Sequence, residues 1–487
     1  MFPPRRWLPE AWIPIVGGLL WLWCAASSGV VGFLLSVIPG CLLLSSGVST
    51  LLYPGDLRIP QFTALGGALG VPLAMPALFL AGPWMGLALV VISAASFVAA
   101  GATSVRQEPH TDEVPEPMPS IALAAQVAID DTILAHVALT HPAVSVDEQE
   151  RVHREICEAR DLFRDRGWLA NPIEYHQAPP PLTDPVIRPA RSLRVDFEHL
   201  EFTSGYQPHA EEPGRDRWLS RAANRTAHAW VLRHGPGPRP WLICIHGYRM
   251  GFPLVDLPAF HAARLHYKYG MNVAIPVLPF HGPRKTGRRS GDGFISGDFL
   301  DTVHAEAQAM WDLRRLMSWI RMQEGAPIGA YGLSLGGYNT ALLACLEELA
   351  CAILGIPATD FTRLTWRHGA QLQIRYAEHQ GLVHDEVSEV LSVVSPFALE
   401  PRVPRERRYI FAAIADRLVP AAQVRDLWHH WDRPRILWYQ GSHVTFRSHP
   451  AVGRLLLDAL RESGLTCQSA PSWRGRRAQG RAAQHDG

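Results

Sequence analysis

Two long apolar runs at the start of the chain constrain its fold more than any other feature. From Ala11 to Leu52 the only polar side chains are serine and threonine, and a second uncharged run extends from Ile59 to Val105. A helix needs about 20 apolar residues to cross a bilayer, so each run is long enough to cross twice. The sequence therefore predicts four transmembrane helices in residues 1–105, near 11–27, 29–52, 62–80 and 83–103.

Charges beside these runs predict the orientation of the segment. Arg5 and Arg6 precede the first run, and positive residues favour the cytoplasmic side. We therefore expect an integral membrane protein whose C-terminal portion lies on the cytoplasmic face, with the loop at Asp56 outside and Arg106 inside. A cleaved signal peptide is an alternative, but the apolar stretch is too long for one and a second stretch follows.

Composition excludes several classes of function. The 487-residue chain carries 46 basic and 45 acidic residues, which leaves a net charge of +1 and gives no reason to expect nucleic acid as a partner. Its seven cysteines show no CxxC or zinc-ligand spacing, and the chain has no H-E-x-x-H or phosphate-binding G-x-x-x-x-G-K-[ST] motif. We therefore expect no metal, no cofactor and no disulfide framework.

Residues 106–194 connect the apolar region to the rest of the chain. After a polar, proline-bearing stretch, apolar residues recur at helical spacing over 121–137. A second helix is predicted over 145–166, because Ser145 and Glu148 form a capping-box pattern at its start. The pattern leaves open whether these two helices pack on the following domain or on the membrane.

Residues 195–465 alternate short apolar runs with helical patterns, which is typical of a mostly parallel sheet flanked by helices. Eight strands are predicted, at 195–202, 226–233, 241–245, 272–277, 328–332, 352–356, 409–413 and 436–439. Helices are expected near 301–322, 335–349, 420–431 and 449–462. The turn at 235–238 predicts a hairpin between the second and third strands. The helical pattern of 361–405 predicts a small cap, and the arginine-rich residues 466–487 are predicted to form a disordered tail.

The pentapeptide Gly332–Gly336 carries the strongest chemical signal. It reads Gly-Leu-Ser-Leu-Gly and fits G-x-S-x-G, with an apolar run before it and a helix-forming run after it. Strand, sharp turn and helix together form a nucleophile elbow, in which the serine backbone is strained and flanking glycines avoid Cβ clashes. We therefore predict that Ser334 is a nucleophile, with Gly332 and Gly336 as the elbow glycines. An ordinary serine in a glycine-rich turn is the alternative.

A nucleophilic serine needs a base and a group that orients the base. Asp416 closely follows the strand 409–413, which places it at the same edge of the sheet as the elbow, and we predict that it is the acid. His443 follows the last strand and is the predicted base. The alternatives are a helix cap as the role of Asp416, Asp360 as the acid and His449 as the base.

Two backbone N–H groups are predicted to form an oxyanion hole, which acyl transfer requires. One belongs to Leu335, directly after the nucleophile, and the other to Tyr248, in the loop after the third predicted strand. The loop after the fourth strand supplies His281 and Arg284 as candidate contacts for an anionic substrate, with a plain loop as the alternative.

These motifs resemble those of the α/β-hydrolase superfamily. The segments that carry the resemblance are Gly332–Tyr338, His246-Gly247, Ala415–Pro420 and Gly441-Ser442-His443. The Gly-Gly-Tyr after Ser334 and the Asp-x-x-Val-Pro block are similar to the prolyl-oligopeptidase and dienelactone-hydrolase branch. The resemblance covers roughly 195–465 and implies an α/β-hydrolase fold with a mostly parallel eight-stranded sheet. Nothing in the chain resembles the propeller domain of prolyl oligopeptidases, which argues against oligopeptidase activity.

The sequence thus predicts a membrane-anchored serine hydrolase that cleaves an ester, thioester or amide through an acyl-serine on Ser334. We expect a small-molecule or lipid ester as its substrate, because the chain is attached to a membrane. Two alternatives stay open. One is a non-catalytic membrane protein that uses the fold as an interaction surface, and the other is an acyltransferase whose acceptor is not water.

Overall fold

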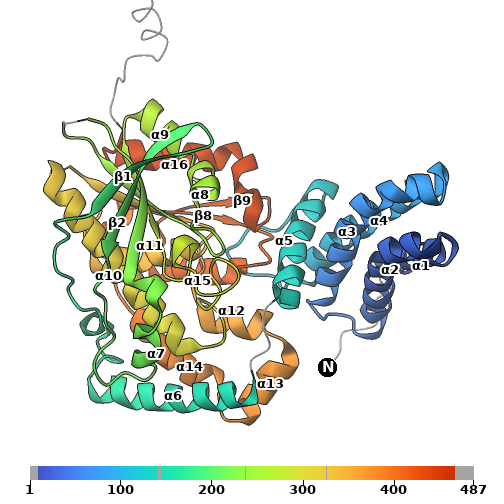
Figure 1. Ribbon diagram of the computed structural model, residues 1–487, viewed down its shortest axis with the longest axis horizontal. Coiled ribbons are helices and arrows are strands. Elements are labelled where there is room, and N and C mark those ends of the chain that lie inside the picture. Colours follow the sequence, from blue (N-terminus) through green and yellow to red (C-terminus); the bar gives the residue numbers. More distant parts are fainter. Residues whose placement is uncertain (1–8, 141–144, 236, 325, 467–487) are drawn as a thin grey trace, which may run out of the picture.

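The computed structural model describes residues 9–140, 145–235, 237–324 and 326–466, and it places a helical bundle beside an α/β domain (Figure 1). The bundle consists of two antiparallel hairpins. Its helices are α1 (Trp12–Ser27), α2 (Gly29–Leu52), α3 (Ile59–Leu80) and α4 (Pro83–Gln107), preceded by the short η1 (Pro9–Ala11). Helix α5 (Ile121–Thr140) lies between the bundle and the α/β domain.

Four N-terminal helices are long and apolar enough to cross a membrane, namely α2, α3, α4 and α5. This set differs from the predicted one. Helix α1, predicted as the first span, has only 16 residues, whereas a bilayer span takes about 20. Helix α5 meets the same criteria, although it was expected only as a helix of the connecting region.

Contacts of the loop between α2 and α3 and of the end of α4 show which end of the bundle faces the α/β domain. Glu10 pairs with Arg106, and the carbonyl of Leu57 and the side chain of Arg58 bond to Arg417 and Gln371 of the α/β domain. The expectation that the loop at Asp56 lies opposite Arg106 is therefore wrong. Helices α1 and α2 form a hairpin, so the chain returns after α2 to the side from which it started.

Nine strands form one sheet, in the order β1-β2-β3-β5-β4-β6-β7-β8-β9. Their bounds are β1 Val186–Ser192, β2 Val195–Thr203, β3 Thr226–Leu232, β4 Trp241–Ile245, β5 Asn272–Val277, β6 Ile328–Leu333, β7 Ala352–Gly355, β8 Arg408–Ala413 and β9 Arg435–Tyr439. The first three strands and the β3–β5 pair are antiparallel, and all remaining pairs are parallel. This is the α/β-hydrolase fold.

All eight predicted strands are present within one or two residues of the expected bounds, and β1 is an addition. The predicted hairpin between the second and third strands is wrong, because β5 lies between β3 and β4. Glycine and proline at 235–238 indicate a turn, but a turn does not decide which strands pair.

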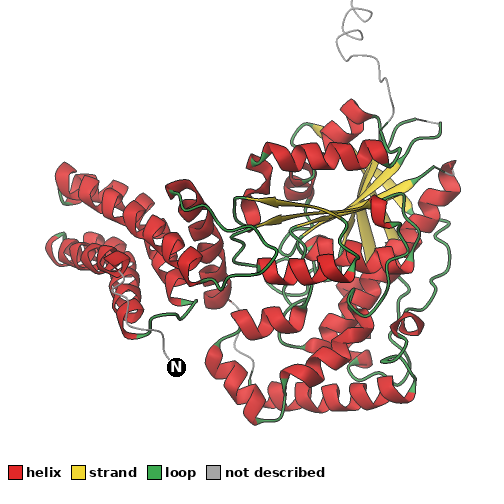
Figure 2. Cartoon of the chain, turned by 180° about the vertical axis from the view of Figure 1, so that it is seen from behind, coloured by secondary structure: helices red, strands yellow, loops and turns green. Residues whose placement is uncertain are grey.

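Helices cover both faces of the sheet (Figure 2). One buried cluster joins the sheet to α10, α11 and α15 through Leu313, Leu342 and Leu427. On the other face, Leu265 and Leu455 join it to α9 and α16. The bounds are α7 Arg215–Leu219, α8 Pro253–Ala259, α9 Ala262–Tyr269, α10 Phe299–Glu324, α11 Leu335–Leu346, α15 Ala421–His430 and α16 Pro450–Glu462. The 3-10 helices are η2 Pro172–Tyr175, η3 Ala222–Arg225, η4 Gly282–Arg284, η5 Ser392–Val394, η6 Arg405–Arg407 and η7 His443–Ser448.

The helical pattern predicted for 361–405 is present as α12 (Phe361–His368), α13 (Gln371–His379) and α14 (His384–Leu391), while a role of these helices as a cap stays a prediction. Helix α6 (Val146–Asp165) begins with the predicted capping box at Ser145 and Glu148. Its apolar face, with Ile156 and Phe163, belongs to the α/β domain's core. The predicted tail lies almost wholly outside the described residues.

Candidate active site

The turn from β6 into α11 has the geometry of a nucleophile elbow. Ser334 adopts φ 56° and ψ −114°, a conformation that L side chains rarely take. The close approach leaves no room for side chains beside it. A Cβ on Gly332 would lie 1.9 Å from the carbonyl oxygen of Gly336, and a Cβ on Gly336 would lie 1.8 Å from that of Ile245. Both elbow glycines are therefore required by contact with backbone atoms.

Ser334, His443 and Asp416 lie together at the carboxyl edge of the parallel strands. The Nε2 atom of His443 is 2.9 Å from Ser334 Oγ, and its Nδ1 atom is 2.7 Å from Asp416 Oδ2. Because Nδ1–H donates to the carboxylate, Nε2 is left as the acceptor for the serine hydroxyl. This arrangement allows proton transfer from Ser334 to His443, which acyl transfer requires.

The acid is fixed by its own loop. Asp416 Oδ1 accepts the backbone N–H groups of Leu418 and Val419, at 3.0 and 2.8 Å, so Oδ2 remains for the imidazole. Burial disfavours the charged form of His443, but the carboxylate of Asp416, with a further contribution from Asp130, outweighs it and raises the pKa of His443 above its ordinary value. The site thus favours the imidazolium form of His443.

The loop after β4 passes directly beside the nucleophile. A Cβ on Gly247 would lie 3.5 Å from Ser334 Cβ, so the adjacent Tyr248 is close to the serine. Leu335 begins α11, whose N-terminal N–H groups have no intrahelical acceptor. Leu335 thus follows the serine directly and Tyr248 follows the neighbouring Gly247, while their roles in an oxyanion hole stay a prediction.

His281 and Arg284 occupy a different setting. Both side chains are completely buried. Arg284 pairs with Asp312 at 2.8 Å and donates to the carbonyl of Val277, and His281 Nδ1 donates to the carbonyl of Pro279. Burial lowers the pKa of His281, which favours the neutral ring. These contacts tie the loop after β5 to the core and present neither side chain to solvent.

The alternative acid and base lie elsewhere. Asp360 caps α12 by accepting the N–H of Arg363 at 2.9 Å. The ring of His449 packs against Tyr439 at the start of α16. Neither side chain has a recorded hydrogen bond to Ser334 or His443 among the described residues.

The sequence did not predict a role at the site for Asp130 or Arg417. Asp130 of α5 accepts the backbone N–H of His443 at 2.8 Å and that of Arg417 at 3.2 Å. The guanidinium of Arg417 binds Asp131 and Glu108. The available signal was a pair of aspartates in the middle of an apolar helix, since charges in such helices are rare without partners.

Within the described chain, two groups of neighbouring side chains consist of residue types that can bind a metal ion. One is His199, Glu201 and His228 on β2 and β3, and the other is His153, Cys157 and Glu386. In the first group the two rings hydrogen-bond at 3.0 Å and Glu201 pairs with Arg188, contacts that account for the arrangement without an ion.

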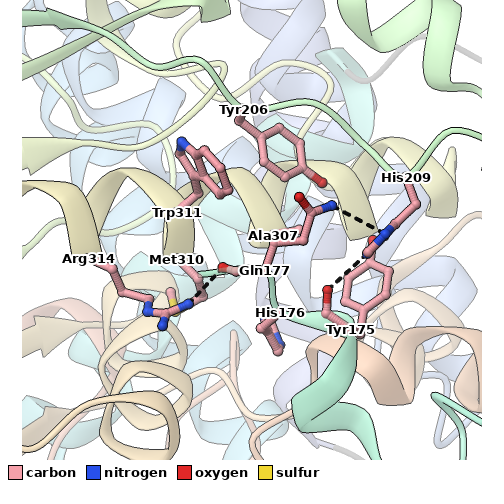
Figure 3. A pocket seen from close by; sticks show the side chains of 9 residues that line it. All are labelled: Tyr175, His176, Gln177, Tyr206, His209, Ala307, Met310, Trp311 and Arg314. Atoms are coloured by element: carbon pink, nitrogen blue, oxygen red, sulfur yellow. Dashed lines mark hydrogen bonds between the residues drawn. The ribbon is translucent and has the colours of Figure 1, made fainter. Parts of the chain in front are cut away.

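A small pocket lies apart from the triad (Figure 3). Its wall comes from residues after α6 and from α10 and shares no residue with the triad or the oxyanion loops. Arg314 donates to the carbonyl of Gln177, and His209 bonds to Gln177 and to the carbonyl of Tyr175. These contacts are made among the lining residues themselves.

Relatives of the chain occur in Mycobacterium tuberculosis. The chain is 44% identical over 357 residues to the uncharacterized protein Rv2627c of strain H37Rv, a match that covers 73% of this chain and 86% of the relative. The uncharacterized protein MT2702 of strain CDC 1551 matches with the same identity and coverage. The chain belongs to the Rv2627c family. No protein-family model matches this family member.

Solved structures resemble this member of the Rv2627c family only in part. The propionate-bound esterase Est2 of Thermogutta terrifontis aligns with a TM-score of 0.35 and 16% identity, over 51% of this chain and 94% of the esterase. A putative dienelactone hydrolase of Klebsiella pneumoniae aligns with a TM-score of 0.35 and 15% identity, over 49% of this chain and 93% of that protein.

Proposed function

We propose that the protein is a membrane-anchored serine hydrolase that forms an acyl-serine on Ser334. The observation that carries the proposal is the continuous hydrogen-bonded path from Ser334 Oγ through His443 to Asp416, at 2.9 and 2.7 Å, on a strained elbow. A serine in a glycine-rich turn needs neither the strained backbone nor a buried carboxylate behind its histidine. A purely structural role for the turn therefore leaves these features without a cause.

The geometry supports a two-step reaction. Ser334 attacks the carbonyl carbon while His443 accepts its proton, and the negative oxygen of the intermediate receives the N–H groups of Leu335 and Tyr248. The imidazolium then protonates the leaving alcohol, thiol or amine, and an acyl-serine remains. Water, deprotonated by His443, then attacks this acyl group. The carboxylic acid product leaves, and Ser334 regains its proton from His443.

The proposed substrates are acyl esters, with thioesters and amides as further members of the class. Apolar helices α4 and α5 adjoin the catalytic loops, where Val105, Leu123 and Val127 pack with Ala415. An ester with an apolar acyl chain fits these surroundings better than a peptide does. A series of p-nitrophenyl esters of increasing chain length, with acyl thioesters and peptidyl amides alongside, tests this preference.

Labelling with a fluorophosphonate probe tests the nucleophile. The full chain should react with the probe, and Ser334→Ala should lose both labelling and roughly 10⁵-fold or more in turnover. Ser220→Ala, which changes an exposed serine of the same domain, should label like the wild type. Equal labelling of Ser334→Ala removes the serine from its role. A folded wild type without labelling or turnover favours a non-catalytic protein, and ester products with added alcohols favour an acyltransferase.

A further inference from the structure

Helix α5 contains two adjacent carboxylates that lie at the interface with the α/β domain. Asp130 and Asp131 are both fully buried in a helix that is otherwise apolar enough to cross a membrane. Buried carboxylates are costly unless hydrogen bonds or charges compensate them. Their partners therefore show what keeps them in place.

Asp130 joins the two loops that carry the proposed base and acid. Its Oδ2 atom accepts the N–H of His443, the base itself, and the N–H of Arg417, the residue after the acid Asp416. Gln126, one turn earlier on α5, also lies within hydrogen-bond distance of Thr445 in the histidine loop. A helix about 300 residues away in sequence thus holds both loops through their backbone.

We propose that Asp130 is a positioning residue for the catalytic histidine, and that α5 is an integral part of the active site. This inference rests on the proposed function. Asp130 fixes the spacing of the two catalytic loops through its hydrogen bonds, and in its ionised form it assists Asp416 in stabilising the imidazolium of His443.

The charges around His443 support the electrostatic part of this role. The carboxylate of Asp416 contacts the ring directly, and Tyr439 of β9 lies nearby. Arg417 is the nearby cation, but its guanidinium pairs with Asp131 and with Glu108. Only the backbone of Arg417 touches Asp130, whose Oδ1 atom has no partner among the described residues. Burial and the neighbouring Asp416 carboxylate raise the pKa of Asp130 to about 7. In its ionised form, Asp130 acts on both His443 and the guanidinium of Arg417.

Arg417 extends this connection to the membrane helices. Besides Asp131 and Glu108, its guanidinium donates to the carbonyl of Leu57, in the loop between α2 and α3. Asp131 accepts in turn from Ser104 near the end of α4. Because the side chain of Arg417 is almost fully buried, the loop of the catalytic acid is held by three separate N-terminal elements.

Substitution of Asp130 in the full, detergent-solubilised chain tests the proposal. Asp130→Asn keeps an oxygen that accepts both N–H groups but removes the charge. Asp130→Ala removes the charge and the hydrogen bonds. Asp216→Asn, at a fully exposed carboxylate, is the matched control. Active-site titration with the fluorophosphonate probe gives the fraction of competent enzyme, so that kcat for p-nitrophenyl butyrate is expressed per reactive serine.

Loss of charge should shift the acid limb of kcat/KM in Asp130→Asn to lower pH, because the imidazolium loses a neighbouring anion. Asp130→Ala should also lose about 100-fold in kcat with KM nearly unchanged, since the loops are no longer held in register. A merely structural role would lower the titrated fraction without moving either quantity. An unmoved acid limb in Asp130→Asn together with a normal kcat per site in Asp130→Ala overturns the proposal. Failure of the proposed function looks different, because the wild type itself would not label.

Discussion

The backbone of Ser334 is a strained point in a well-packed region, and its neighbours explain how the strain persists. Gly336 makes the tightest contact, since its added Cβ would lie 1.8 Å from the carbonyl oxygen of Ile245 on β4. The elbow and the strand that leads to the oxyanion loop are therefore in direct backbone contact. A side chain at Gly336 must push these two elements apart.

Gly336→Ala should therefore lose both stability and activity. We expect the free energy of unfolding to fall by about 3 kcal/mol, because backbone atoms cannot yield as a flexible side chain would. Thermal unfolding and fluorophosphonate labelling measure the two effects. Ser334→Ala is the contrast, because it should lose labelling while keeping its unfolding temperature. A Gly336→Ala protein as stable as the wild type would show that the elbow is looser than the structure indicates.

The pH dependence of the reaction should reflect His443. Its carboxylate neighbours raise its pKa above the ordinary 6.5, and only the neutral ring can accept the proton of Ser334. As pH falls through this raised pKa the ring becomes protonated, so activity is lost at a higher pH than for an unperturbed histidine. The plot of kcat/KM against pH should show an acid limb with its midpoint above 6.5. A rate that stays constant down to pH 5 contradicts this.

Sequence reasoning reached Ser334, Asp416 and His443 because each follows a strand in a recognisable local pattern. Their joint placement then follows from parallel strands that end at one edge. Asp130 was out of reach for a physical reason, since its role arises only when α5 docks against loops far along the chain. His281 and Arg284 were candidate contacts because of their loop, but ion pairing and burial are decided by tertiary packing.

At the scale of elements, the strands with continuous apolar runs were predictable from the sequence, whereas the edge strand β1 was not. Strand β1 contains only exposed and half-buried residues and includes Pro189, a pattern typical of an edge strand and a weak signal in sequence. The sequence did not predict that β5 lies between β3 and β4. A turn after β3 indicates that the chain changes direction, but it does not indicate which strand pairs with β3. Pairing depends on which apolar faces meet in the assembled sheet.

The contact between α4 and α5 decides how the bundle meets the catalytic domain. Gly101 of α4 lies so close to α5 that a Cβ would come 1.8 Å from the carbonyl oxygen of Ala124. Small residues at helix interfaces allow such close approach. Ala64, Ala100 and Ala128 form a buried cluster of α3, α4 and α5. The three helices are therefore packed almost backbone to backbone.

Gly101→Ala should loosen this contact. Alanine normally stabilises a helix interior by up to about 1 kcal/mol relative to glycine, but here the clash should reverse the sign and cost about 1–2 kcal/mol. Gly453→Ala in α16 is the matched control, since nothing lies within 4 Å of its added Cβ. Unfolding temperatures in detergent should fall for Gly101→Ala and rise or stay level for Gly453→Ala. Equal shifts for the two variants would show that α4 and α5 are not in close contact.

For the whole molecule, the catalytic domain and the apolar helices form one connected structure. The loop between α2 and α3 bonds to Arg417 and Gln371, and Glu108 at the end of α4 binds Arg367 and Arg417. The turns between α1 and α2 and between α3 and α4 lie at the far end of the bundle (Figure 1). Any membrane that the helices cross must therefore lie between these turns and the catalytic domain.

This arrangement gives a specific topology. Helix α1 has 16 residues and rises about 24 Å, less than the roughly 30 Å hydrocarbon core, so it needs η1 or a locally thinner bilayer to cross. Reporters fused after Asp56 and Arg106 should both show the cytoplasmic side, in line with Arg5 and Arg6 at the N-terminus. Reporters at Ser28 and Gly82 should show the opposite side, because each lies at the far turn of a hairpin. Opposite signals at Asp56 and Arg106 would require the hairpin α3–α4 to cross an odd number of times, which its contacts with the catalytic domain at both ends do not allow.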